Sequence, residues 1–335
     1  MLRIAVLGCG RIGRMHAENI HTHPRAVLAG VFDVVKAASE DIASRLGVPH
    51  FPTSDAVFDS AEVDAILIAT STATHADFIE QAMRCGKPVL CEKPIDLSLD
   101  RVKLCAERIA GSDLPIMLGF VRRFDEGHGA VRKAVAAGTL GELHQLTITS
   151  RDPDIATDAY IEASGGIFHD MTIHDFDMAR FIMGEEFETV SAVGARLVSP
   201  ELMERCDDYD TITVVMTTAS GKQCTILNSR RAVYGSDQRV EAFGSAGMAI
   251  SENRTEHGAK IYGATFTDQG APNLNFFIER YGSAFAAEID AFVDAVETGQ
   301  PPSVGFADGQ KALELAEAAR LSVREGRSVK LSEFS

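Results

Sequence analysis

The sequence predicts an α/β protein, with a doubly wound parallel sheet of the Rossmann type followed by an α+β domain on an open, mainly antiparallel sheet. Over the first 120 residues, apolar runs alternate with helical periods, which is the pattern of βαβ units. The first apolar run breaks directly into a glycine-rich turn. Beyond residue 121, several runs alternate in polarity and lie close enough along the chain to pair antiparallel.

Length and composition limit the possible classes of protein. The chain has 335 residues, 45% hydrophobic and 24% charged, and we predict two domains, residues 1–120 and 121–335. The net charge of −16, without a basic stripe, argues against nucleic acid or an anionic membrane as partner. No apolar run approaches the ~20 residues of a membrane span and no signal segment is apparent. We therefore expect a soluble, cytoplasmic protein whose six cysteines are reduced.

In the first domain, strands are expected at residues 2–7, 27–32, 64–69, 89–91 and 114–120, with helices near 15–21, 37–46 and 75–85. Ligands of open parallel sheets bind at the carboxyl ends of the strands. Four segments follow strand ends and should line one crevice there: Gly8 to Gly13, Asp33, Thr70 to His75, and Glu92 with Lys93.

The first turn has the spacing G-x-G-x-x-G, with Arg11 and Ile12 between Gly10 and Gly13. Bare glycines before a helix let a pyrophosphate approach backbone N–H groups and the positive helix end. Asp33, at the end of the second strand, is placed to accept hydrogen bonds from ribose hydroxyls and to repel a 2′-phosphate. The pattern predicts NAD rather than NADP, although Lys36 leaves some NADP use open. The alternative is a glycine-rich turn that binds no nucleotide.

In the second domain, strands are expected at residues 145–150, 189–197, 211–217, 222–228 and 240–243. A helix follows the pair Gly165 and Gly166. A final amphipathic helix at about 306–325 could pack on either domain. An open sheet with one face toward solvent commonly finds a partner, so oligomerisation is expected.

Two groups of residues could carry chemistry. Lys93 lies at a strand end where the nicotinamide should sit, and a lysine there can hold a substrate hydroxyl and favour its alkoxide form. Asp170 and His174 are four residues apart in the predicted helix, hence neighbours on one face. A histidine oriented by a carboxylate is the usual general base at neutral pH. The alternatives are a solvated lysine, and an acidic helix cap beside a structural histidine.

Other charged residues permit weaker inferences. Arg122 and Asp152 each follow an expected strand and could face the crevice, or simply be solvated. Asp170, His174, Asp175 and Asp177 are all possible metal ligands. Near neighbours on a helix point in different directions and no HExxH pattern is present, so we expect no metal.

These motifs together resemble the Gfo/Idh/MocA family of sugar and polyol oxidoreductases over essentially the whole chain. The resemblance is carried by Gly8 to His16, Ala69 to His75, Gly86 to Pro94 and Asp170-x-x-x-His174-Asp175. Within the family, Gly119 to Asp125, Arg151 to Pro153 and Ser164 to Phe181 look most like inositol 2-dehydrogenases.

The resemblance implies a catalytic set of Lys93, Asp170 and His174. His174 would take the proton of the reacting hydroxyl, Lys93 would bond its oxygen, and Asp170 would position the histidine and bind a neighbouring hydroxyl. It also implies that Arg122 and Asp152 contact substrate and that the protein is a homotetramer. The implied cofactor contacts include Thr70, Ser71, Thr72, His75, Glu92 and Lys93.

The reaction expected from these residues is the NAD-dependent oxidation of myo-inositol to its 2-keto product, scyllo-inosose, in inositol catabolism. One alternative is a dehydrogenase of another polyol or sugar, such as scyllo-inositol, D-chiro-inositol or an aldose. A second is a regulatory protein that senses the nucleotide without turnover, which would have no need of Lys93 or His174.

Overall fold

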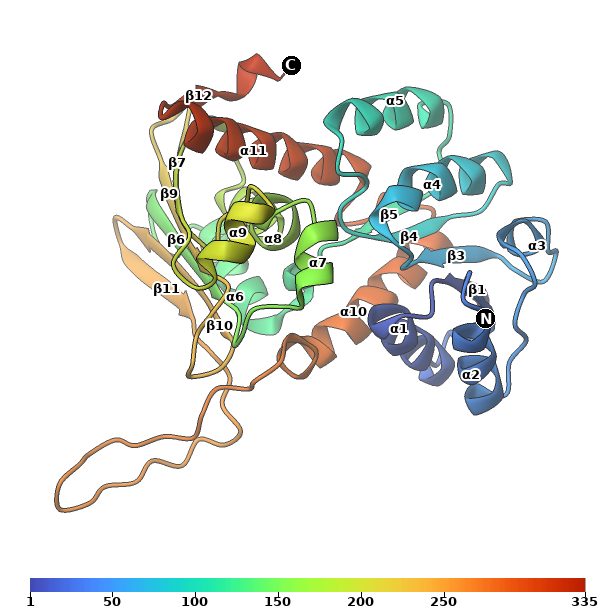
Figure 1. Cartoon of the computed structure of the whole chain (residues 1–335), viewed down its shortest axis with the longest axis horizontal. Coiled ribbons are helices and arrows are strands. Elements are labelled where there is room, and N and C mark those ends of the chain that lie inside the picture. The colour runs from blue at the N-terminus through green and yellow to red at the C-terminus, as the bar shows by residue number, and fades with distance from the viewer. Residues whose placement is uncertain (335) are drawn as a thin grey trace. The chain divides into compact units, whose positions relative to one another are not determined.

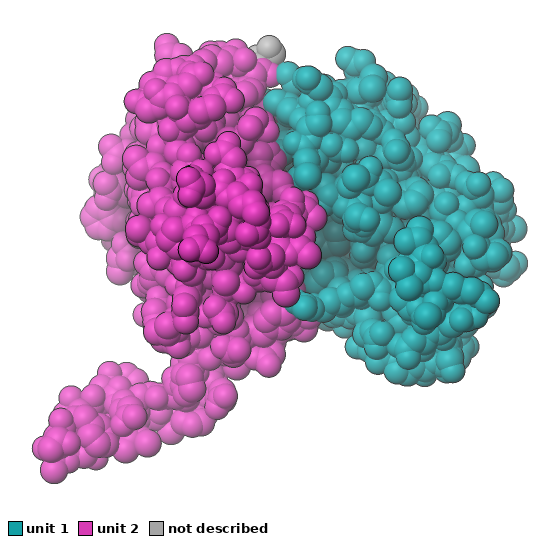
Figure 2. Space-filling model, viewed as in Figure 1, with its two compact units in different colours: residues 1–121, 283–313 teal, residues 122–282, 314–335 magenta. Residues whose placement is uncertain are grey.

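The computed structural model describes residues 1–334, which form two compact units (Figure 2). The first contains residues 1–121 and 283–313, and the second contains 122–282 and 314–335. The division is thus more complex than a single boundary at residue 120, because the chain returns to the first unit near its C-terminal end. Within that unit, the ring of His16 packs edge-to-face on Phe285, and the amide of Leu118 donates to the carbonyl of Val304 at 3.2 Å.

The first unit is built on a five-stranded sheet in the order β2-β1-β3-β4-β5, whose strands all pair in parallel. This confirms the predicted Rossmann-type sheet. Its strands are β1 (Leu2–Leu7), β2 (Ala26–Phe32), β3 (Ala65–Ile68), β4 (Val89–Glu92) and β5 (Ile116–Gly119). Its helices include α1 (Arg11–Thr22), α2 (Lys36–Leu46), α3 (Ser54–Phe58), α4 (His75–Arg84) and α5 (Leu99–Ile109).

The position of β1 explains where this unit can bind a ligand. Every residue of β3 is buried, as expected for a parallel strand covered on both faces. β1 pairs with β2 on one side and with β3 on the other, so the connections after β1 and after β2 leave in opposite directions. Such a reversal opens a crevice at the carboxyl ends of the strands. The glycine turn lies at this point.

The second unit contains a seven-stranded sheet in the order β11-β10-β6-β9-β8-β7-β12. Its pairs are antiparallel except β6 with β9, which are parallel, so the prediction of a mainly antiparallel sheet is confirmed. The strands are β6 (Leu143–Arg151), β7 (Phe187–Ala195), β8 (Thr211–Thr218), β9 (Gln223–Ser229), β10 (Asp237–Gly244), β11 (Gly247–Ser251) and β12 (Val329–Lys330).

Helices cover one face of this sheet (Figure 1). The main ones are α6 (Glu126–Ala136), which contacts β10 and β11, and α8 (Ile173–Met183), which contacts β6. The short helices are α7 (Asp158–Ala163) and α9 (Pro200–Arg205). Between β11 and α10, residues 252–276 extend away from the sheet (Figure 1) and carry only isolated bridges.

Two long helices lie near the C-terminal end of the chain, before β12. α10 (Phe277–Thr298) begins in the second unit and continues in the first, whereas α11 (Phe306–Glu325) runs the other way. α11 has the predicted bounds. Among residues 1–334, no helix is both long and apolar enough to span a bilayer.

Candidate active site

The glycine turn between β1 and α1 has little room for side chains. A Cβ on Gly8, whose φ is +94°, would lie 2.3 Å from the carbonyl oxygen of Ala69, and one on Gly13 would lie 1.9 Å from that of Gly8. A Cβ on Gly10, by contrast, would meet nothing within 4 Å. The turn is therefore packed tightly beneath Gly8 and Gly13 and open at Gly10. No acidic residue occupies the first turn of α1, so its positive end can attract a diphosphate.

Asp33 is oriented by this turn. One carboxylate oxygen accepts the amide of Cys9 and the other accepts the amide of Val35, both at 2.7 Å. Each oxygen keeps a further lone pair that can accept a ribose hydroxyl. Burial and the charge of Asp33 raise the pKa of Cys9 to about 12, so its thiol stays neutral. These residues fit the adenosine half of NAD.

A buried histidine joins the turn after β3 to the segment after β4. His75 Nδ1 lies 2.8 Å from the carbonyl oxygen of Pro94, and Nε2 lies 3.1 Å from that of Thr70. Burial lowers the pKa of His75, so the ring is neutral at pH 7 and donates from one nitrogen only. His75 is 1% exposed and holds the backbone beside Lys93. Its predicted contact with the cofactor stays a prediction.

The remaining residues that the sequence predicts to contact the cofactor differ in their access to solvent. Arg11 and Ser71 are exposed, whereas Ile12, Thr70, Thr72, Glu92 and Lys93 are half-buried. The hydroxyl of Thr70 lies 2.7 Å from that of Thr74. Lys93 follows the last residue of β4, so the structure places all these residues at the carboxyl edge of one sheet.

In the second unit, Asp170 lies in a π-helical turn, η3 (Phe168–Thr172), that leads directly into α8. The predicted helix is therefore not α-helical throughout. π-helical turns occur often at functional sites. From residue 171 to 179 every side chain is buried except that of His174, which is half-buried. His174 is thus the residue of this stretch that reaches toward solvent.

Asp170 is held by two residues that are distant in the sequence. One carboxylate oxygen accepts the hydroxyl of Tyr160 at 2.7 Å, and the other accepts Arg230 at 3.1 Å. Arg230 is 2% exposed and also pairs with Asp208 at 3.5 Å. This fixes the orientation of the Asp170 carboxylate before any substrate arrives.

Arg122 forms a buried network with the first turn of α8. It donates to Ser150 at 2.8 Å and to Asp175, and Asp175 also accepts Ser150 at 2.6 Å and Asn228 at 2.7 Å. Arg123 makes a forked pair with Asp177 at 2.6 and 2.8 Å. The carboxylates of Asp175 and Asp177 are therefore engaged by arginine.

Asp152 belongs to the same cluster of charges. Burial and the charge of Asp170 raise its pKa from 3.8 to about 6, although Arg230 and Arg122 oppose the shift. Arg122 and Asp170 therefore each lie close enough to Asp152 to affect its carboxyl group.

Replacing Asp152 by asparagine should stabilise the protein above about pH 6. The pKa of Asp152 is about 6 in the folded state and 3.8 in the unfolded state. Its contribution to the free energy of unfolding is therefore complete below pH 3.8 and is lost as the pH rises to about 6. At pH 7 we expect Asp152→Asn to raise the free energy of unfolding by about 1–3 kcal/mol, measured by urea titration. Asp154→Asn, at an exposed carboxylate, is the matched control. A gain that is equally large at pH 4 would contradict this assignment.

Sequence reasoning missed Tyr160, Ser150, Asn228 and Arg230. One signal could have found Arg230. β6 and β9 are parallel neighbours with Arg151 opposite Ser229, so the residues after both strands, Asp152 and Arg230, emerge at the same edge. The parallel pairing is not apparent from the alternation of the strands.

The second unit also contains a cavity of about 550 Å³ whose lining includes Gly165, His169, Asp208 and Arg320. Asp170 and His174 do not line it. The cavity is therefore separate from the predicted substrate residues.

The first unit has a parallel sheet with a dinucleotide-binding turn, and the second unit has an oriented carboxylate and a histidine beside a mixed sheet. This combination defines the class of two-domain, dinucleotide-dependent oxidoreductases. Residues 2–120 match the oxidoreductase family with an NAD-binding Rossmann fold, and residues 128–250 match the GFO/IDH/MocA C-terminal domain. The chain belongs to the GFO/IDH/MocA family of oxidoreductases. NAD as cofactor is confirmed.

Three relatives illustrate the similarity. The chain is 46% identical to the inositol 2-dehydrogenase of Rhizobium meliloti and 43% identical to the myo-inositol 2-dehydrogenase of Thermotoga maritima, over 99% of each chain in both cases. The crystal structure of the scyllo-inositol dehydrogenase of Lactobacillus casei, with bound NAD(H) and scyllo-inositol, superimposes with a TM-score of 0.92 at 28% identity and covers 99% of both chains.

Proposed function

We propose that this protein oxidises myo-inositol to scyllo-inosose with NAD. The observation that carries the substrate proposal is the similarity of the whole chain, at 46% and 43% identity, to an inositol 2-dehydrogenase and a myo-inositol 2-dehydrogenase. The cluster around Asp170 supports a polyol, because a site built to bond many hydroxyls rejects analogues that lack one.

His174 is the proposed general base, which removes the proton of the reacting hydroxyl. Lys93 donates a hydrogen bond to the same oxygen and stabilises the negative charge that develops there. Asp170, already oriented by Tyr160 and Arg230, positions His174 and accepts a neighbouring hydroxyl. NAD, when bound, accepts the hydride that leaves the carbinol carbon.

Arg122 and Asp152 are the proposed substrate contacts beyond the reacting carbon. Arg122 is already held by Ser150 and Asp175, so its orientation requires little further ordering on binding. Asp152 titrates near pH 6. Above that pH its carboxylate would accept substrate hydroxyls more strongly than the neutral acid does, since charged acceptors form the stronger hydrogen bonds.

The cofactor is held, in this proposal, by the glycine turn with Gly8, Gly10, Arg11, Ile12 and Gly13 and by Asp33 at the ribose. Further contacts come from the turn after β3 and from the end of β4, namely Thr70, Ser71, Thr72, His75, Glu92 and Lys93.

Initial rates with NAD across a panel of polyols test the proposal. We expect the highest kcat/KM with myo-inositol and lower values with scyllo-inositol, D-chiro-inositol and glucose. A preference for scyllo-inositol is the main alternative, since a neighbouring structure holds that polyol. Rates at background with every inositol would refute the substrate, and NAD binding without any turnover would indicate a regulator.

We also propose that the enzyme works in the cytoplasm as a homotetramer in inositol catabolism. The face of the seven-stranded sheet that the helices leave uncovered carries exposed apolar residues, which are Val193, Val215, Phe243, Met248 and Ile250. A patch of this kind favours self-association. All six cysteines are free thiols, which fits a reducing compartment.

A further inference from the structure

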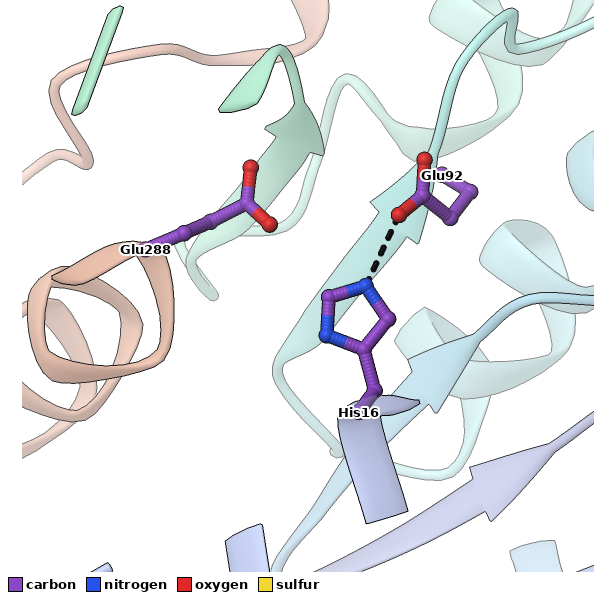
Figure 3. A group of neighbouring side chains, drawn as sticks. All are labelled: His16, Glu92 and Glu288. Carbon is purple, nitrogen blue, oxygen red and sulfur yellow. Dashed lines mark hydrogen bonds and ion pairs between the residues drawn. The ribbon is translucent and has the colours of Figure 1, made fainter. Parts of the chain in front are cut away.

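The first unit contains a buried group of two carboxylates and one imidazole, of which the proposed function uses only Glu92, as a cofactor contact. His16 comes from α1, Glu92 from the end of β4, and Glu288 from α10 (Figure 3). His16 Nε2 lies 2.8 Å from Glu92 Oε1. His16 and Glu288 are fully buried, and the side chain of Glu92 is 16% exposed.

Glu288 is the unexplained member. Figure 3 shows its carboxylate pointing toward His16 and Glu92. Neither of its oxygens has a hydrogen-bond partner, and neither has His16 Nδ1. A buried carboxylate without a partner costs several kcal/mol, so the fold must hold something that compensates for it.

The spacing of the three residues indicates which compensation applies. One ligand atom from each residue lies within 4.8 Å of the other two, yet Glu288 makes no hydrogen bond to either neighbour. A shared proton would bring two carboxyl oxygens within about 2.5–2.7 Å. A cation bound at about 2.0–2.2 Å from each atom instead needs separations of roughly 3–4 Å, which small side-chain movements supply.

We propose that His16, Glu92 and Glu288 form a binding site for one divalent transition-metal ion. Two carboxylates and a neutral imidazole carry a charge of about −2, which a divalent ion balances. An imidazole ligand favours Zn²⁺ over Mg²⁺ and Ca²⁺, which prefer oxygen ligands alone. The bound ion joins α1, β4 and α10 and fixes Glu92, the residue before Lys93. Its role is structural, and no step of the proposed oxidation passes through it.

The surroundings of Glu92 support a fixed orientation. A Cβ on Gly119 would lie 2.8 Å from Glu92 Oε2, so the carboxylate lies close against the backbone of β5. On the other side, the ring of Phe285 packs edge-to-face on His16 at 5.6 Å between centroids. Phe285 and Glu288 lie one turn apart on α10, so this ring covers the His16 side of the group.

Metal binding to the untagged full-length protein tests the proposal. After treatment with a chelator and dialysis, Zn²⁺ is titrated in competition with a chromophoric chelator, and Co²⁺ is added separately to follow its visible absorption. We expect one equivalent of either metal per chain, and a Tm that rises by a few degrees at saturating Zn²⁺. Glu288→Gln should weaken Zn²⁺ binding by at least about 100-fold.

The control is Glu317→Gln, because Glu317 also pairs with a buried histidine, His169, at 2.8 Å but has no third ligand in the described part of the chain. Unchanged stoichiometric binding in this variant supports the site. Wild-type protein that takes up less than about a tenth of an equivalent would refute it, as would equal affinity in Glu288→Gln. The readout is metal uptake, so failure here leaves the proposed oxidation untouched.

Discussion

Replacing His174 by glutamine should lower kcat by about 10²–10⁴-fold while leaving NAD binding nearly unchanged. Glutamine keeps a hydrogen-bonding side chain of similar reach but cannot accept the substrate proton, and positioned proton transfer contributes a factor of this size. The measurement is the initial rate of NADH formation with saturating myo-inositol. NAD binding is followed through the rise in Tm that the cofactor causes.

His169→Gln is the matched control for this substitution. His169 lies five residues earlier, and its ring faces Glu317 at 2.8 Å, in the second unit. We expect its kcat within a few-fold of wild type and a lower Tm, because the buried pair is lost. If His174→Gln retains more than about a tenth of the wild-type kcat, His174 is not the general base and the proposed mechanism is wrong.

The parts of the fold that were predictable are those with a strong local pattern. The buried strands of the first sheet read as short apolar runs ended by glycine or polar residues, and α11 has the predicted bounds. Two strands were not predicted from the sequence, and both lie at an edge of the second sheet. β12 has only two residues, and most of β11 is exposed. Nothing in the helical period of α10 indicates that it returns to the first unit.

The candidate site likewise contains some residues that local sequence predicts and others that it does not. The glycine turn and Asp33 follow from local sequence, since the chain must turn tightly between a strand and a helix there. The partners of Asp170 do not, because Tyr160 and Arg230 reach it through tertiary contacts. The π-helical turn is also invisible in the sequence. The hydroxyl of Thr172, the last residue of this turn, lies 3.1 Å from the carbonyl oxygen of Ile167 and 2.7 Å from the side-chain oxygen of Asn228, which is distant in the sequence.

Replacing Lys93 by methionine should lower kcat by about 10²–10³-fold, which corresponds to about 2.7–4 kcal/mol of lost transition-state stabilisation. Methionine preserves most of the length and the apolar stem but removes the ammonium that stabilises the developing alkoxide. The charge develops only as the hydroxyl proton leaves, so the loss should appear mainly in kcat, with KM for myo-inositol changed by less than about ten-fold. Steady-state kinetics at fixed, saturating NAD separates the two.

Lys93→Arg distinguishes a catalytic ammonium from one that only maintains structure. Arginine keeps the positive charge but presents it on a broad, planar guanidinium group. The charge in the folded state is therefore unchanged, whereas activity should recover only in part. Lys103→Met, on α5 of the same unit, is the control for the loss of a lysine and should keep wild-type kcat. If Lys93→Met loses Tm and activity together while Lys93→Arg restores both in full, the residue supports the fold. The hydrogen bond to the reacting oxygen must then come from another group.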